Sequence, residues 1–336
     1  ELAADLRDGD LFALAESLEG SLTRDEALLT RAVERAVREG QPAAQAFTAE
    51  RYGYFLGASG RWEESLVQFA QAIAIHEARG ARHQQAIDIT SGGRSWNARA
   101  GRLAESLEYA AQFRAIADEL GDALLLAWRS MEAEPYIYLG RWADAVRVAE
   151  ESLPIAREIG EYPVILFASA WLTQAYLKLG RVDEARAVIV RALRWGETNM
   201  SPVPFPLSYA SVARVLVHLA DGELADALAR AQTAVRLAEQ SQFRLEMGAA
   251  HRALAMAHEA RGERGDAERA YRRSLEILED ERPRPEFGQT LLAYGRFKRG
   301  DDAAESRRLV ERARALFAAI GATGWAAEAD AALSAG

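Results

Sequence analysis

Apolar side chains recur every three or four positions along almost the whole chain, in segments separated by short breaks. After Gly180, for example, they fall at Val182, Ala185, Ile189 and Leu193. This spacing places them on one face of an α-helix. Segments of about 15 to 18 residues repeat the pattern on both sides of each break. The sequence therefore predicts an all-α fold built from successive pairs of antiparallel helices.

Two interleaved series of breaks divide the chain into regular units. The first series consists of Gly60, Gly101, Gly140, Gly180, Gly222, Gly262 and Gly300. The second lies about 20 residues away and consists of Gly40, Gly80, Gly121, Gly160, residues 196–201, Ser241, a break near Arg282, and Gly321. Glycine adopts the left-handed conformation that ends a helix. Each unit is thus predicted to be a helix–turn–helix repeat of about 40 residues.

Small residues follow the turn glycines at a fixed distance. Five positions after the first six glycines stand Ser65, Ser106, Ala145, Ala185, Ala227 and Ala267. Two helices that cross closely require small side chains at the crossing. Gly300 departs from the pattern, because Glu305 stands at that position and Ser306 comes one place later. The phrase Gly-Arg-Trp occurs at two of these turns, and we interpret Trp62 and Trp142 as packing residues that anchor the corner.

This pattern of glycine, small and apolar positions resembles the tetratricopeptide repeat. The residues that carry the match best are Gly262, Ala267, Tyr271 and Leu275, then Tyr176, Gly180, Ala185 and Leu193, then Gly53, Gly60, Phe69 and Ile73. The resemblance covers nearly the whole chain and implies a superhelical solenoid of about seven to eight helix–turn–helix repeats. We expect one array over residues 1–336, with an irregular N-terminal cap unit at 1–40, repeats at 41–321 and a C-terminal capping helix at 322–336. Thr23 and Glu26 are predicted to form a capping box within the cap unit.

The length of the repeats narrows the resemblance. The standard tetratricopeptide unit has 34 residues, so each unit here is longer by roughly six, close to an extra turn for one or both of its helices. Such stretched repeats resemble the sensor arm of transcription activators of the maltose-regulon type, related ATPase-linked bacterial regulators, and some nucleotide cyclases. The resemblance implies a larger bacterial regulator that carries an ATPase, cyclase or DNA-binding domain in addition to this segment.

Charge and composition disfavour several other classes of protein. The chain has 50 acidic and 41 basic residues, a net charge of -9, which opposes binding to nucleic acid or anionic lipid. It has no cysteine, which rules out disulfide and thiolate chemistry and fits a reducing compartment. Its apolar runs are far shorter than the roughly 18 residues that a membrane span needs. We expect a cytoplasmic protein without membrane or nucleic-acid contact by this segment.

The sequence offers no convergent set of reactive groups. His251 and His258 are seven residues apart, roughly 10 Å along one helix, which is too far to share a metal ion. His218 and His258 stand where other units have tyrosine, so we interpret them as packing residues. We therefore expect no catalytic residue, no metal and no cofactor, and predict that the chain is not an enzyme.

Two segments allow more than one interpretation. Gly92 and Gly93 lie inside a predicted helix, where each costs on the order of 1 kcal/mol relative to alanine. Either a neighbouring helix approaches closely there, or the glycines leave room for a ligand. The proline-rich segment 199–208 either covers an apolar edge of the solenoid or contacts a partner.

The concave face of such a solenoid is lined by the first helix of each pair. The groove-facing offsets of the tetratricopeptide family, counted back from each turn glycine, give charged, amide and aromatic positions at which we predict ligand contact. These are Glu50, Tyr54, Asp88, Ser95, Arg99, Glu134, Tyr138, Gln174, Lys178 and Arg252. We expect the main contact surface around Asp88, Arg99, Glu134 and Tyr138. Before Gly222 the offsets fall on Tyr209, Val212, Leu216 and Leu219, so either the register there is off by one or the groove is dry.

These observations predict a binding protein rather than a catalyst. The carboxylate clamp by which some tetratricopeptide proteins hold a peptide C-terminus is not reproduced, because Asn97 lies off the groove. The expected role is a non-catalytic module that binds a protein, a peptide or a small polar ligand, as the sensor or scaffold region of a bacterial signalling or transcription regulator. The alternative is a self-contained receptor for a short signalling peptide. Such receptors usually carry many groove asparagines, and this chain has only Asn97 and Asn199.

Overall fold

The computed structural model describes residues 8–199, 204–279 and 284–335. The expected break near Arg282 and part of the proline-rich segment 199–208 lie outside the described residues. Every regular element in the described chain is helical, which confirms the all-α prediction. None of the described helices is long and apolar enough to span a bilayer.

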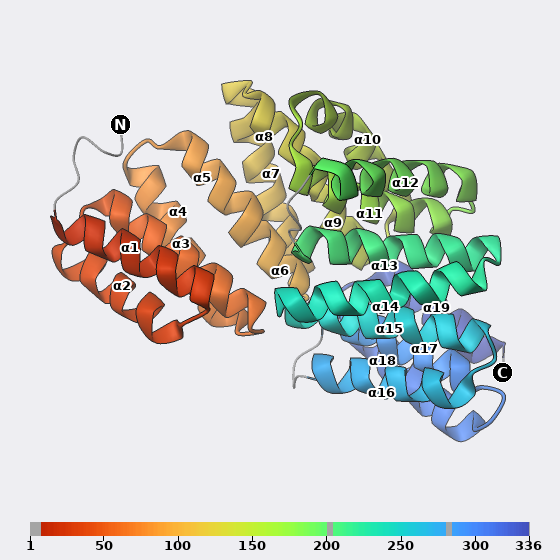
Figure 1. Cartoon of the computed structure of the whole chain (residues 1–336). Coiled ribbons are helices and arrows are strands. Elements are labelled where there is room, and N and C mark those ends of the chain that lie inside the picture. The colour runs from red at the N-terminus through yellow and green to blue at the C-terminus, as the bar shows by residue number, and fades with distance from the viewer. Residues whose placement is uncertain (1–7, 200–203, 280–283, 336) are drawn as a thin grey trace. The chain divides into compact units, whose positions relative to one another are not determined.

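The helices follow one another as eight pairs and a final single helix (Figure 1). The pairs are α1 (Asp8–Thr23) with α2 (Glu26–Glu39), α3 (Pro42–Ala58) with α4 (Trp62–Ala78), α5 (Arg82–Asp88), η1 (Ile89–Arg94) and α6 (Ser95–Arg99) with α7 (Leu103–Leu120), α8 (Ala123–Trp128), η2 (Arg129–Glu132) and α9 (Ala133–Leu139) with α10 (Trp142–Ile159), α11 (Tyr162–Lys178) with α12 (Val182–Asn199), α13 (Pro204–Asp221) with α14 (Leu224–Ser241), α15 (Arg244–Ala260) with α16 (Arg264–Leu278), and α17 (Pro285–Lys298) with α18 (Ala303–Ala319). The last helix is α19 (Thr323–Ser334). In two pairs the first helix is interrupted, once by the π-helical turn η1 and once by the 3₁₀ turn η2. The predicted repeat architecture is confirmed.

The chain groups into two compact units. The first unit contains residues 1–97 and 104–125, and the second contains residues 98–103 and 126–336. The expectation of one array from residue 1 to 336 stays a prediction, because each unit is compact by itself.

The predicted turn glycines have the expected backbone conformation at six of seven positions. The values of φ range from 74° at Gly140 and Gly222 to 86° at Gly60, which is the left-handed region. Gly300 is not among the residues with positive φ. There α18 begins only at Ala303, after Asp302 as N-cap, so the small residue moves one place along the chain. This longer turn explains why Ser306, rather than residue 305, is buried and donates a hydrogen bond to the carbonyl of Gly295 at 2.7 Å.

Two sequence predictions about helix ends are wrong. The N-cap of α2 is Asp25, whose carboxylate accepts hydrogen bonds from the amides of Ala27 and Leu28 at 2.9 and 3.2 Å. The Thr23 hydroxyl donates instead to the carbonyl of Glu19 at 2.7 Å, so it forms no capping box with Glu26. The break expected at residues 196–201 is also misplaced at its start, because α12 continues to Asn199.

The small residues after the turns lie where helices cross. Ala185 and Ala267 are fully buried. The buried Ser65 hydroxyl donates to the carbonyl of Gly53 at 2.7 Å, which joins α4 to α3. Trp62 packs against Trp96 with ring centroids 5.6 Å apart, which confirms its interpretation as a packing residue. The corner is therefore held by close backbone approach and one large apolar anchor.

Within the second unit the chain returns on itself, because α19 contacts α9. The two glycines at this contact touch through their backbones: a Cβ atom added to Gly140 would lie 2.6 Å from Cα of Gly324. Next to them, the indole Nε1 of Trp325 donates a hydrogen bond to the carbonyl of Ile137 at 2.9 Å. The spacing of residues within a repeat did not predict this contact between α19 and α9, which are far apart in the sequence.

The closure predicts unequal effects of two similar substitutions. Gly140 and Gly180 have φ values of 74° and 75°, but a Cβ at Gly180 meets no atom within 4 Å. Gly180→Ala should cost only the left-handed strain of an L-residue, about 1–2 kcal/mol. Gly140→Ala adds the overlap with Gly324, for which overpacking costs about 1–3 kcal/mol more. Urea unfolding of both variants measures the difference, and equal losses would show that α19 does not pack on α9.

Candidate functional site

The ten residues predicted to contact a ligand belong to two separate groups. Glu50, Tyr54, Asp88 and Ser95 lie in the first unit. Arg99, Glu134, Tyr138, Gln174, Lys178 and Arg252 lie in the second. The predicted contact surface around Asp88, Arg99, Glu134 and Tyr138 consists of side chains that are almost completely buried. Their part in ligand binding stays a prediction, and the structure gives them packing and ion-pairing partners.

The group in the first unit consists of polar side chains, of which Asp88 and Ser95 are buried and Glu50 and Tyr54 are partly buried. Oδ2 of Asp88 lies 3.1 Å from Nδ1 of His76, and the Tyr54 ring meets the Phe69 ring edge-on at 5.0 Å. Burial raises the pKa of Glu50 to about 7, and the nearby charge of Asp88 adds to the shift. Burial also raises the pKa of Asp88. Ser95 is buried as well. These residues form a polar layer inside the unit.

The glycine pair in the first unit is explained by close packing. A Cβ at Gly92 would lie 2.0 Å from the ring of Phe69, and a Cβ at Gly93 would lie 2.6 Å from the ring of Tyr109. Both glycines are buried in the π-helical turn η1. Of the two interpretations offered by the sequence, close approach of neighbouring elements is therefore the correct one.

In the second unit, Arg99 stands between two buried glutamates. Its Nε donates to Oε1 of Glu134 at 2.9 Å, and its Nη1 donates to Oε1 of Glu246 at 3.1 Å. The three side chains are at most 4 % exposed. The three residues come from α6, α9 and α15. The guanidinium of Arg99 therefore joins these three helices to one another.

A second arginine extends this arrangement. Arg252 on α15 pairs with Oε2 of Glu286 at 2.6 Å and donates to Oε1 of Gln289 at 3.1 Å, both on α17. The hydroxyl of Tyr138 lies 3.1 Å from that of Tyr209 and 3.4 Å from Oε1 of Glu286. We call the connected set the central network. It consists of Arg99, Glu134, Tyr138, Tyr209, Glu246, Arg252 and Glu286.

The central network holds three carboxyl groups against two guanidinium groups. Burial raises the pKa of Glu246 to about 7, and the charges of Glu286 and Glu134 add to this, whereas Arg99 opposes it. Oε2 of Glu246 accepts no hydrogen bond from any residue that the structure describes. Burial and the neighbouring carboxyl groups therefore favour the protonated form of Glu246 up to near-neutral pH.

A cavity of about 340 Å³ lies between the first helices of four successive pairs. Its walls are formed by α11, α13, α15 and α17, and Trp142 and Trp325 lie at the side where α19 returns. Three of the predicted ligand-contact residues line it, namely Gln174, Lys178 and Arg252. Gln174 and Arg252 also line a smaller cavity beside Glu246 and Glu286, so the central network lies against the inner end.

The lining of the cavity combines cationic side chains with apolar ones. Lys178, Arg252 and Arg296 supply the charge. The Lys178 ammonium lies 4.4 Å from the ring centre of Trp325 and 5.5 Å from that of Trp142. Burial lowers the pKa of Lys178, and the charges of Arg296 and Arg252 act in the same direction, while Glu328 opposes them. Trp142 is therefore more than a packing residue, because its ring also lines the cavity.

Of the four positions expected before Gly222, Val212 and Leu216 line the cavity and Tyr209 belongs to the central network. Whether the register or the polarity of the groove explains this apolar set stays a prediction. Sequence reasoning missed Gln289, Arg296 and Trp325. The first two lie in the helix before Gly300, to which the groove offsets were not carried. No sequence pattern pointed to Trp325, because it reaches the cavity only through the contact of α19 with α9.

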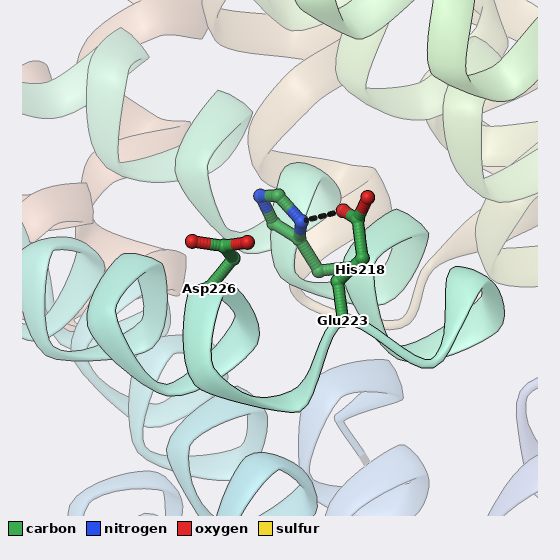
Figure 2. Close-up of side chains that lie close together, drawn as sticks. All are labelled: His218, Glu223 and Asp226. Atoms are coloured by element: carbon green, nitrogen blue, oxygen red, sulfur yellow. Dashed lines mark hydrogen bonds and ion pairs between the residues drawn. The ribbon is translucent and has the colours of Figure 1, made fainter.

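A possible metal-ligand group lies at the turn between α13 and α14 (Figure 2). One potential ligand atom from each of His218, Glu223 and Asp226 lies within 4.8 Å of the others, and Nδ1 of His218 is 2.6 Å from Oε2 of Glu223. The next repeat has the same pair, with His258 and Glu263 at 2.6 Å. Since the pair recurs at the same corner, its first role is to join the two ends of the turn.

The equivalent corners of two earlier repeats use a different pair. There Arg141 lies 4.9 Å from the Tyr136 ring centre, and Arg181 lies 4.3 Å from that of Tyr176. The tyrosine and arginine of these two repeats thus occupy the positions of the histidine and glutamate in the later ones. In each case the pair joins the two sides of the turn. This confirms that the histidine of the corner takes the place of the tyrosine.

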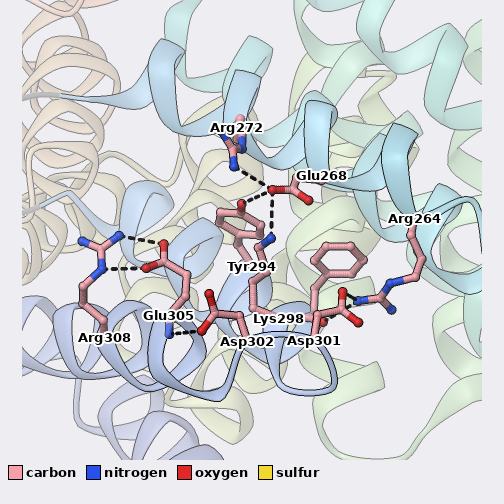
Figure 3. Close-up of polar contacts among 10 residues, drawn as sticks. Arg264, Glu268, Arg272, Tyr294, Lys298, Asp301, Asp302, Glu305 and Arg308 are labelled. Carbon is pink, nitrogen blue, oxygen red and sulfur yellow. Dashed lines mark hydrogen bonds and ion pairs between the residues drawn. The ribbon is translucent and has the colours of Figure 1, made fainter.

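The outer face carries exposed ion pairs between neighbouring helices (Figure 3). Glu268 on α16 accepts hydrogen bonds from Lys298 at 2.8 Å, from Tyr294 at 3.1 Å and from Arg272 at 2.7 Å. These donors lower the pKa of Glu268 to about 2, with Lys298 the largest cause. Lys298 and Arg272 of this face are thus engaged with an acidic neighbour.

Comparison with known proteins supports the type of repeat. Residues 250–285, which contain most of α15 and α16, match the family model described as "Tetratricopeptide repeat". The fold is that of tetratricopeptide-type repeats. A search among curated proteins finds no match. The finer resemblance to maltose-regulon-type activators and nucleotide cyclases stays a prediction.

Solved structures share the fold over almost the whole chain. NprR in complex with its cognate peptide NprX is 13% identical, with a TM-score of 0.63, and the match covers 94% of this chain and 90% of that one. A Rap protein complexed with competence and sporulation factor is 12% identical, with a TM-score of 0.61 and coverage of 98% and 97%. Aspartyl phosphate phosphatase F from Bacillus subtilis is 13% identical, with a TM-score of 0.58 and coverage of 94% and 85%.

The raised pKa of Glu246 predicts a pH-dependent stability. A carboxyl whose pKa is raised from 4.5 to about 7 on folding favours the folded state below pH 4.5, and this advantage is lost as pH rises towards 7. Glu246→Gln cannot ionise, so between pH 5 and pH 8 it should lose less stability than the wild type, by on the order of 1–3 kcal/mol.

Urea unfolding at the two pH values measures this difference. Glu276→Gln, which removes a carboxyl exposed on α16, is the control and should follow the wild type. If Glu246→Gln shows the same pH dependence as this control, Glu246 does not titrate in this range.

Proposed function

We propose that the chain is a non-catalytic binding module whose second unit takes a small ligand, or the end of a peptide, into the cavity between α11, α13, α15 and α17. The observation that carries the proposal is the lining of this cavity. Charged and amide side chains at predicted groove positions line it together with apolar side chains. A volume of about 340 Å³ is within the range of small-molecule sites.

The composition of the cavity is suited to binding. Fixed polar groups select the orientation of a ligand, and apolar and aromatic walls supply most of the contact area. Gln174 and Gln289 offer amide groups, and Trp142 and Trp325 offer aromatic surface at the side closed by α19. The side chains around the cavity are held by partners, Arg252 by Glu286 and Lys178 by Glu328, so the site is formed before a ligand arrives.

In this proposal the module is the sensor or scaffold region of a larger bacterial signalling or transcription regulator. The length of the repeats supports the role through their resemblance to the sensor arms of such regulators. A ligand in the cavity would contact Trp142 and Trp325 together. Because these rings lie on either side of the junction between α19 and the rest of the unit, binding can be transmitted as a change in α19.

The second candidate is a self-contained receptor for a short signalling peptide. It is favoured by two structural neighbours that have the same fold over more than nine-tenths of this chain and are described in complex with NprX and with competence and sporulation factor. The scarcity of asparagine in this chain weighs against a peptide whose backbone is bound along the groove. A peptide end that enters the cavity is compatible with both roles.

Filling the cavity tests the proposal. Ala293 lines the cavity and is partly exposed, so Ala293→Phe places a ring in the space that a ligand would take. Ala315 is exposed on α18 away from the cavity, and Ala315→Phe is the matched control. A library of small metabolites and short peptides is screened by thermal shift with the wild type, and the compounds found are titrated into both variants.

Compounds that bind in the cavity should lose about tenfold or more in affinity for Ala293→Phe, about 1.4 kcal/mol, and bind Ala315→Phe as they bind the wild type. Compounds that bind both variants equally, or a library that yields none, would contradict a ligand site in the cavity.

A further inference from the structure

Resting on the function proposed above, we propose that the ligand is an amphipathic anion with one carboxylate and an apolar body, and that its carboxylate replaces Glu328 between Lys178 and Arg296. Glu328 is then an internal competitor that occupies the anion site when no ligand is bound. The steps below follow from the charges, the partners and the walls of the cavity.

The charge of the cavity selects the sign of the ligand. Lys178, Arg252 and Arg296 line it, and none of its lining residues in the described chain is acidic. This concentration of positive charge lies in a chain whose net charge is -9. Lys178 and Arg296 share the single carboxylate of Glu328, so the cavity keeps an excess of positive charge at that end. This excess disfavours a cationic ligand, although two tryptophan rings are present that could otherwise receive it, and favours an anion.

The partners of the cations show where the anion binds. Arg252 is held by Glu286, Gln289 and Thr290 of the neighbouring helix α17, within the packed interior. Lys178 and Arg296 share a different partner, the carboxylate of Glu328 on α19. Nη2 of Arg296 lies 3.1 Å from Oε2 of that carboxylate, whose side chain is 23 % exposed. This is the one pair of cavity cations whose described counter-ion lies on the closing helix.

Replacement of Glu328 by a ligand is favourable in both charge and geometry. A ligand carboxylate has the same charge and the same two oxygens, so Lys178 and Arg296 keep a partner throughout. The Glu328 side chain is partly exposed, so its carboxylate can turn to solvent when it is released. The helix α19 stays attached meanwhile, through the hydrogen bond from Trp325 to Ile137 and the contact between Gly140 and Gly324.

The remaining walls require that the anion carry an apolar body. The lining also contains Val212, Leu216, Met256 and Leu292, and Trp142 and Trp325 add aromatic surface. A small polar anion such as phosphate would leave these walls in contact with water and gain nothing from them. Two sources fit the same chemistry: a free aliphatic acid and the C-terminal end of an apolar peptide.

The test compares acids with their neutral amides. Octanoate and octanamide, and acetyl-Leu-Leu with a free carboxylate or a carboxamide, are titrated calorimetrically into the full chain. The acid of each pair should bind about tenfold or more tightly than its amide, because only the acid can pair with Lys178 and Arg296. The tighter of the two acids identifies the source as aliphatic acid or peptide end.

Four variants locate the effect. Lys178→Met and Arg296→Met should each weaken octanoate binding by about tenfold and leave octanamide unchanged, since the amide does not use the charges. Glu328→Gln should strengthen octanoate binding, because the competitor has lost its charge. Asp330→Asn removes a carboxylate from the same helix, where it pairs with Arg314, and should bind as the wild type. Circular dichroism and thermal midpoints establish that each variant is folded.

The comparison of acid with amide in the wild type needs no variant, so it stands even where one fails to fold. Equal affinity for acid and amide, no binding of either acid, or weaker octanoate binding by Glu328→Gln overturns the inference. If the library screen then yields neutral compounds that Ala293→Phe excludes, the cavity is still a ligand site and only the assignment of an anionic ligand fails. If the screen yields none, both proposals fail.

Discussion

The second unit depends on one buried guanidinium. Arg99 is the last residue of α6, and its guanidinium donates hydrogen bonds to Glu134 on α9 and Glu246 on α15. A buried charge is tolerated only where partners replace its hydration, and removal of one partner leaves the others unpaired at a cost of several kcal/mol. A shift of any of these helices along its axis would separate Arg99 from Glu134 or Glu246 and leave a buried charge unpaired. The central network fixes the register of the first helices more strictly than apolar packing alone.

Much of this architecture could be read from the sequence, because the repeat is encoded locally. The turn glycines, the small residues after them and the groove positions Gln174, Lys178 and Arg252 all follow from fixed offsets within about 40 residues. Of the apolar set before Gly222, Val212 and Leu216 line the cavity. What these positions share is that a single helix hairpin determines them.

The sequence could not distinguish groove positions that face a cavity from those that are buried. Arg99 and Glu134 have the offsets of ligand-contact residues, but Arg99 bonds to Glu246, which lies 147 residues later. Likewise Trp325 and Ile137, which join α19 to α9, are separated by 188 residues. Such contacts depend on small rotations that accumulate from repeat to repeat. No local sequence pattern shows the accumulated rotation. The contact between α19 and α9 and the burial of Arg99 could therefore be seen only in the structure.

Because the repeats are long, the same first helices can contribute to both the central network and the cavity. A first helix of 17 residues, such as α11 or α15, is about 25 Å long. On α15 the network residue Glu246 lies near the N-terminal end, Arg252 takes part in both layers, and Met256 lines the cavity near the C-terminal end. On α17 the same order holds for Glu286, Gln289 and Arg296. The polar side chains of the central network pair with one another and so hold the helices together at one height along their axes. One to two turns further along the same helices, other side chains can therefore line a cavity. A shorter helix would have to use the same residues for both purposes, and a ligand that paired with them would compete with the interactions that hold the unit together.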